Sequence, residues 1–278
     1  MTTPQGPRKR LPNNPSEENL RKQSKQLAKD EGLQLAAAQR RLAIEYGYHN
    51  WADLMRAVAS RLVPLVPLRE LVAFPHEVYP IFIGRRTSLR AIDAATDPKL
   101  PLAINKPILL VAQRDAKVAA PTSADMYEVG TLGIIVERQR HSDGTARIVA
   151  EGRQRVRVKR FVFGQKFFKA EVEQVEDTGD SDVQAQRVGV SSSDRPSRTE
   201  SLMRSVLAAF HRFAYGHRPS LREAADAIEK LADPAVVSYK IARYLDIETA
   251  EQQALLESNS PVERLEKILG YLEAAKAN

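Results

Sequence analysis

Cysteine is absent from this chain of 278 residues, and its absence excludes disulfides, thiolate catalysis and cysteine-bound zinc. The five histidines are scattered without the spacing of paired metal ligands, so we expect no metal site. No stretch approaches the roughly 18 uncharged apolar residues that a membrane span needs, and the first residues lack the apolar core of a secretory signal. We therefore expect a cytoplasmic protein that has no membrane partner.

Signatures of catalysis are also missing from the sequence. A phosphate-binding loop needs two glycines separated by four residues and followed by Lys and Ser or Thr, and no segment has this pattern. There is no Gly-x-Ser-x-Gly turn and no His-Glu-x-x-His helix, the nearest string being His76 to Pro80. His76 is better interpreted as a hydrogen-bonded structural residue. We predict that the chain uses no cofactor and is not an enzyme.

Charged residues are numerous but mixed in sign. Lys and Arg total 42 against 35 Asp and Glu, and the formal net charge of +7 is compatible with an anionic partner. Basic and acidic residues are interleaved along most of the chain, which is more typical of a solvated surface than of a phosphate-binding stripe. Two runs are exceptions, Arg8 to Arg10 in the predicted tail and Arg153 to Arg160, and the candidate anion-contacting residues of the second are Arg153, Arg155, Arg157 and Lys159. Because Val156 and Val158 alternate with them, we expect these basic side chains on the solvated face of a strand.

Composition and periodicity predict an α+β protein. With 43% apolar residues, the chain is long enough to bury a sizeable core in two domains. The predicted segments are a disordered tail (1–14), a small N-terminal helical unit (15–61), a bent β-rich domain (62–177), a polar linker (178–199) and a C-terminal bundle of short helices (200–278).

Capping patterns delimit three helices in the N-terminal unit. Asn14 to Glu17 opens the first helix, Gly32 and Gly47 end the first and second, and Asn50 to Asp53 opens the third. Trp51, the only tryptophan, is expected to pack in the core of this unit instead of anchoring a partner. The predicted apolar stripe of the second helix is Leu35, Ala38, Leu42 and Tyr46.

The segment 62–177 has the composition of strands. Prolines and a glycine punctuate short apolar runs between Pro67 and Gly84, which is typical of short bent strands. A short helix is expected over 88–95, and a buried strand over 106–113. His141 to Gly144 predicts a hairpin turn between two long strands. Farther on, residues 200–278 have helical periodicity, with breaks at Asp233-Pro234 and Asp246 and a capping box at Ser260 to Glu263, and predict five short helices.

Several of these segments together resemble the N-terminal substrate-recognition domain of the ATP-dependent Lon proteases. In the strand half they are Pro67 to Gly84, Val111 to Gln113, Tyr127 to Val136 and Ala146 to Val156. In the helical half they are Met203 to Phe210, Leu231 to Val237, Ile241 to Ile247 and Leu255 to Lys267. The resemblance runs from about residue 63 to the end and implies a LON-type domain. In a complete Lon protease the ATPase and protease modules follow this region, so the resemblance implies a stand-alone protein that lacks both.

The resemblance further implies a non-catalytic polypeptide-binding module linked to protein quality control or regulated proteolysis. Its expected partners are unfolded or degron-bearing polypeptides, which an exposed strand edge and apolar pockets can bind. Glu77 departs from the apolar residue that the family usually has after Pro-His, and a charge there is expected to weaken the capture of exposed apolar segments by the surface near it. The candidate substrate-binding residues are Phe74, Tyr79, Ile81 and Phe82.

Two alternatives remain open at this point. The chain could be a basic regulatory protein that contacts nucleic acid through its N-terminal leader and the ladder from Arg153 to Arg160. It could also be an accessory subunit that assembles with a complete ATP-dependent protease.

Overall fold

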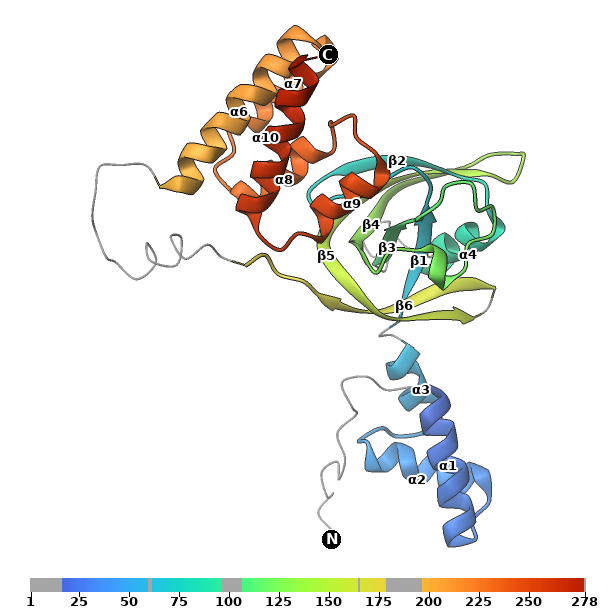
Figure 1. The fold of residues 1–278 in the computed structure, drawn as a ribbon. Helices are drawn as coiled ribbons and strands as arrows, with labels where there is room; N and C mark the ends of the chain where they lie inside the picture. The colour runs from blue at the N-terminus through green and yellow to red at the C-terminus, as the bar shows by residue number, and fades with distance from the viewer. Residues whose placement is uncertain (1–16, 60–61, 97–106, 165, 179–196, 278) are drawn as a thin grey trace. The chain divides into compact units, whose positions relative to one another are not determined.

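The computed structural model describes residues 17–59, 62–96, 107–164, 166–178 and 197–277 (Figure 1). The chain divides into two compact units, Met1–Leu62 and Val63–Asn278. The predicted tail, the capping sequence at Asn14 and most of the predicted linker lie outside the described residues. No helix in the described ranges is long and apolar enough to cross a membrane.

The first unit consists of three helices, α1 (Glu17–Glu31), α2 (Leu35–Glu45) and α3 (Trp51–Ala59). Their shared core is built around Leu20, Leu42 and Leu54, and Trp51 packs against it, as the sequence predicts. The prediction that Leu35 belongs to the buried stripe is wrong, because this residue is the first of α2 and its side chain is exposed at the end of the packed face.

The second unit contains a closed β-structure. Its strands are β1 (Leu62–Leu68), β2 (Val78–Ile83), β3 (Ile108–Ala112), β4 (Val129–Arg140), β5 (Ala146–Gly164) and β6 (Phe167–Gln174). The sheet order is β2-β5-β4-β3-β1-β6, and β5 also pairs with β6, so five strands close into a barrel while β2 lies outside the ring. The short helix α4 (Arg86–Ala95) packs its buried residues into the barrel core.

The shape of the barrel follows from its longest strand. β5 pairs with β2 through its first residues and with β6 through its last ones, and both pairings are antiparallel. Register shifts between Leu132 and Gly133 and between Val158 and Arg160 bend the strands enough to close the ring. The β4–β5 connection is the predicted hairpin at His141 to Gly144, where Gly144 has a φ of 85° and the His141 amide donates to the Thr145 carbonyl.

One glycine of β5 allows the chain before β2 to approach the barrel closely. A Cβ atom at Gly152 would lie 2.4 Å from the carbonyl oxygen of Phe74. The His76 amide donates to the Gly152 carbonyl, and the Gly152 amide donates to the Glu77 carbonyl. The segment from Phe74 to Glu77 is thereby held against β5, and it sets where β2 begins.

The helical half of the second unit comprises α6 (Arg198–Gly216), α7 (Arg222–Ile228), α8 (Pro234–Ala242), α9 (Thr249–Glu257) and α10 (Pro261–Ala277). The prediction of short helices is wrong for α6 and α10, which have 19 and 17 residues and pack against each other. The faces that they present to the shared core carry buried apolar residues over about two turns each, from Val206 to Phe213 in α6 and from Leu265 to Leu272 in α10. The mixed architecture confirms the α+β class.

The barrel and the helices share one core. Val72, Phe74 and Val129 of the strand half pack with residues of α6, α8, α9 and α10. The Gln253 side chain of α9 donates to the Val129 carbonyl at 3.0 Å. The second unit is therefore one body in which the helices cover one side of the barrel (Figure 1).

A buried arginine reinforces this junction. Arg155 of β5 is only 3% exposed, and its guanidinium donates to the carbonyls of Leu256, Ser258 and Glu176 and to the carboxylate of Asp177. The prediction that Arg155 lies on a solvated face is thus wrong. That face of β5 is covered by the α9–α10 connection, more than a hundred residues later in the chain.

Candidate functional site

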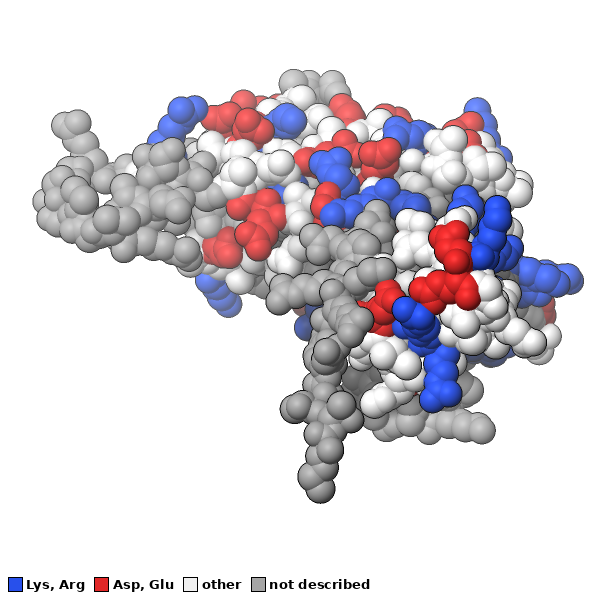
Figure 2. Space-filling model, turned by 90° about the horizontal axis from the view of Figure 1, so that it is seen from below, with Lys and Arg blue, Asp and Glu red and all other residues white. Residues whose placement is uncertain are grey.

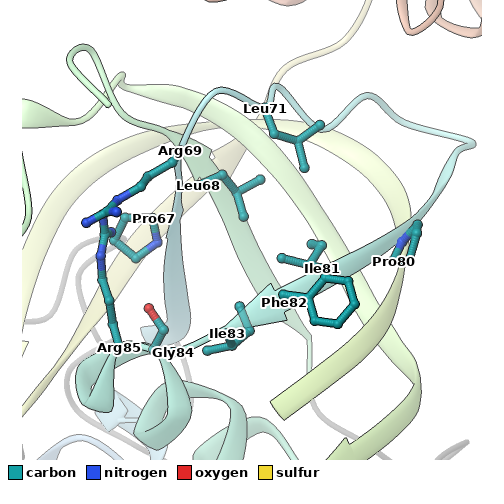
Figure 3. Close-up of a pocket in the computed structure, with 11 residues that line it drawn as sticks. Pro67, Leu68, Arg69, Leu71, Pro80, Ile81, Phe82, Ile83, Gly84 and Arg85 are labelled. Carbon is teal, nitrogen blue, oxygen red and sulfur yellow. The ribbon is translucent and has the colours of Figure 1, made fainter. Parts of the chain in front are cut away.

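A pocket of about 460 Å³ lies between the end of β1 and the outer strand β2 (Figure 3). This volume falls in the range of ligand sites in proteins. Most of its walls are apolar, and two arginines lie at one end. The lining residues from β1 and the turn after it are Pro67, Leu68, Arg69 and Leu71, and those from β2 and the start of α4 are Pro80, Ile81, Phe82, Ile83, Gly84, Arg85 and Ser88.

Alternation along β2 determines which side chains are available at the pocket. Tyr79, Ile81 and Ile83 are buried, whereas Val78 and Phe82 are exposed, Phe82 by 75%. A phenyl ring exposed to this degree beside an apolar pocket is apolar surface that a bound partner could bury. Pro80, which has no amide hydrogen, lies between them at another exposed position, as expected for proline in an outer strand.

The outer strand also offers main-chain groups. β2 is the terminal strand of the sheet order and pairs with β5 alone among the described strands. An edge of this kind can accept an extended chain as an additional strand, while side-chain pockets beside it receive alternate residues.

Of the four candidate substrate-binding residues, the structure brings Ile81 and Phe82 together in the pocket. Phe74 is fully buried in the core shared with the helices, where its ring lies 6.1 Å from that of Tyr239. Tyr79 is buried in the barrel core, and its hydroxyl accepts a hydrogen bond from the Phe74 amide at 2.8 Å. Burial raises the pKa of the Tyr79 phenol well above its ordinary value.

The expectation that the charge of Glu77 weakens the capture of apolar segments at the surface is wrong. Glu77 is buried, and its carboxylate accepts hydrogen bonds from Lys240 of α8, at 2.9 Å, and from Arg243, the residue that follows α8. The Arg243 guanidinium also lies 4.9 Å from the centre of the Tyr79 ring. The charge that was expected to repel apolar segments is therefore neutralised in the junction between barrel and helices, away from solvent.

Sequence reasoning missed the polar end of the pocket, which is formed by Arg69 and Arg85. Each arginine follows the end of a strand, β1 or β2, and that placement was the available signal. Arg85 donates to the side chain of Gln113, which is buried at the end of β3. The Gln113 side-chain amide in turn donates to the carbonyls of Asp115, at 3.2 Å, and Val118, at 3.1 Å. The orientation of Arg85 is therefore fixed by the barrel.

The basic ladder of β5 is largely neutralised within the chain. Arg153 pairs with Glu151 at 2.8 Å and Lys159 with Glu173 at 2.7 Å, while Arg155 is buried as described above. Arg157 is exposed. In the described part of the face drawn in Figure 2, basic and acidic side chains are intermingled. This arrangement lacks the continuous positive potential that phosphate binding requires.

Within the described ranges, no group of three or more His, Asp or Glu residues is placed to hold a metal ion.

Comparison with known families gives this fold a context. A family model described as the ATP-dependent protease La (LON) substrate-binding domain matches residues 62–274. The chain belongs to the Lon substrate-binding domain family. The matched range includes the whole barrel, the pocket and nearly all of the helical half, and it confirms the resemblance recognised in the sequence.

Individual relatives agree with the assignment to the Lon substrate-binding family. The chain is 36% identical to Lon protease 1 of Myxococcus xanthus over 211 residues, 76% of this chain and 24% of that protein. It is 33% identical to Lon protease 3 of Sorangium cellulosum over 234 residues, 82% of this chain and 25% of that protein. The chain thus spans about a quarter of the length of these curated relatives.

A solved structure shows the same fold. The N-terminal domain of a Lon protease from the Mycobacterium avium complex superimposes with a TM-score of 0.55 over 76% of this chain and 98% of that domain. The sequence identity is 18%, so this likeness concerns the Lon-type fold alone.

Proposed function

We propose that this protein binds unfolded or degron-bearing polypeptides at the pocket between β1 and β2. The observation that carries the proposal is the 75% exposure of Phe82 beside the apolar pocket and along the open edge of β2. An extended segment would bury its side chains against Ile81 and Phe82 while its main chain pairs with the edge. Membership of the Lon substrate-binding family supports this kind of ligand.

The proposed activity is association without catalysis, in the cytoplasm, as part of protein quality control or regulated proteolysis. The bound polypeptide would be passed to an ATP-dependent protease, since the matching family model is described as a domain of such an enzyme and the relatives are named Lon proteases. Purified protein should therefore neither hydrolyse ATP nor cleave an unfolded substrate such as casein. Turnover of either substrate would contradict the proposal.

The test of the site is the affinity for a fluorescently labelled apolar peptide, measured by anisotropy. Burial of a phenylalanine side chain contributes about 1.5–3 kcal/mol, so Phe82→Ser should weaken binding by about tenfold or more. Phe163→Ser is the matched control, because Phe163 is also an exposed phenylalanine of a strand, at 61%, and does not line the pocket. Equal effects of the two substitutions, or none from Phe82→Ser, would place polypeptide binding elsewhere.

A further inference from the structure

Two guanidinium groups converge at one end of the pocket. Arg69 extends from the turn after β1 and Arg85 from the residue before α4, and their side chains point toward each other across the pocket end (Figure 3). Two like charges so placed repel each other, and an anion between them would relieve the repulsion.

The polar partners of Arg85 within the described chain leave its charge uncompensated. Its guanidinium donates to the amide oxygen of Gln113 and, at 3.4 Å, to the Val118 carbonyl, both of which are neutral groups. Burial lowers the pKa of Arg85, and the positive charge of Arg69 lowers it further. Among the described residues, no carboxylate lies within ion-pair distance of Arg69 or Arg85. Other arginines of the barrel, such as Arg138 and Arg153, do have acidic partners.

The end of the pocket is also organised before any ligand arrives. The main-chain amide of Gln113 donates to the Leu68 carbonyl at 2.8 Å, which ties β3 to the residue before Arg69. The side chain of Gln113 then positions the Arg85 guanidinium. Because Arg85 is held in this way, its guanidinium loses little conformational entropy when it binds an anion.

The rest of the pocket is apolar and extends in one direction from the arginines, toward Leu71, Ile81 and Pro80 (Figure 3). An occupant that matches this distribution has apolar side chains on one side and a negative charge at its end. The last residues of a polypeptide, with their α-carboxylate, have this form, whereas an internal acidic side chain would have chain continuing on both sides of the charge.

We propose that the pocket binds the C-terminus of a polypeptide, with Arg69 and Arg85 holding the terminal carboxylate and the apolar walls receiving the last side chains. This inference rests on the proposed polypeptide-binding function and names the part of the polypeptide that the site selects.

The experiment compares three labelled peptides of one apolar sequence by fluorescence anisotropy with the full chain. The first ends in a free carboxylate, the second in an amide, and the third in an amide but with an aspartate within the sequence. A hydrogen bond to a charged carboxylate contributes about 1.5–3 kcal/mol to binding. The peptide with the free acid should therefore bind about tenfold or more tightly than the peptide that ends in an amide. Arg69→Gln and Arg85→Gln should each remove most of the difference in affinity between the free acid and the amide.

Arg86→Gln is the matched control, since Arg86 is the adjacent exposed arginine and does not line the pocket. Equal affinities for free acid and amide would overturn C-terminal recognition while leaving polypeptide binding intact. If the internal aspartate binds as tightly as the free acid, the site reads acidic side chains and the proposal is wrong. If none of the three peptides binds, the proposed function fails as well.

Discussion

Replacing Arg155 by methionine tests how the barrel and the helical half hold together. The substitution keeps an unbranched side chain of similar length but removes every donor of the guanidinium. The carbonyl of Ser258 and the carboxylate of Asp177 keep a partner, because Arg264 donates to each at 2.7 Å. Two carbonyls lose the donor that Arg155 supplies, those of Leu256, at 3.0 Å, and Glu176, at 3.2 Å.

The size of the effect follows mainly from the Leu256 carbonyl, because its bond to Arg155 is buried, whereas the bond to the Glu176 carbonyl is only part-buried and water can replace it. A buried acceptor without a donor costs about 1–3 kcal/mol. We therefore expect Arg155→Met to lower the free energy of unfolding by about 2 kcal/mol. The measurement is urea unfolding followed by far-UV circular dichroism, because the only tryptophan, Trp51, belongs to the first compact unit and reports on that unit.

Arg157→Met is the control for this prediction. Arg157 lies two residues farther along the same strand and is exposed, so its replacement should change the free energy of unfolding by no more than about 0.5 kcal/mol. Equal losses for Arg155→Met and Arg157→Met would refute the view that the buried guanidinium joins the two halves of the unit.

Two further predictions concern the same junction. Glu77→Gln removes the carboxylate charge that pairs with Lys240 and Arg243 and should lower the free energy of unfolding by about 1.5–3 kcal/mol. The control Glu173→Gln breaks an exposed pair with Lys159 and should lower the free energy of unfolding by less than about 1 kcal/mol. Comparable losses for the two variants would mean that Glu77 is not a buried partner. Burial raises the pKa of Tyr239 from its ordinary value of 10 to about 12, so the folded state favours the neutral phenol. The resulting contribution to the free energy of unfolding is complete below pH 10 and is lost between pH 10 and about 12. Tyr239→Phe should therefore reduce the loss of stability over that range in pH-dependent urea unfolding, and an unchanged slope would contradict the raised pKa.

Local patterns were sufficient to predict much of the second unit. The hairpin at His141 to Gly144, the buried strand before Gln113 and the helix N-terminus at Pro261 follow from turn residues, apolar runs and caps, whose effects extend over a few neighbours in the chain. The ordered series of such segments also indicated the family. Helix lengths were less predictable, since α6 and α10 are long because they pack against each other.

The sequence by itself therefore determined the class of elements, their order and the LON-type fold, because these depend on local conformational preference and on the period of apolar residues. Only the tertiary structure decided the site. Period two shows that Tyr79 and Phe82 lie on opposite faces of β2, but which face is buried depends on the pairing with β5. Likewise, Arg155 is buried because distant residues of the α9–α10 connection cover it, and Arg69 and Arg85 converge because the ends of β1 and β2 border the same pocket. Burial and convergence of charge are set by contacts between remote segments, and no local pattern encodes them.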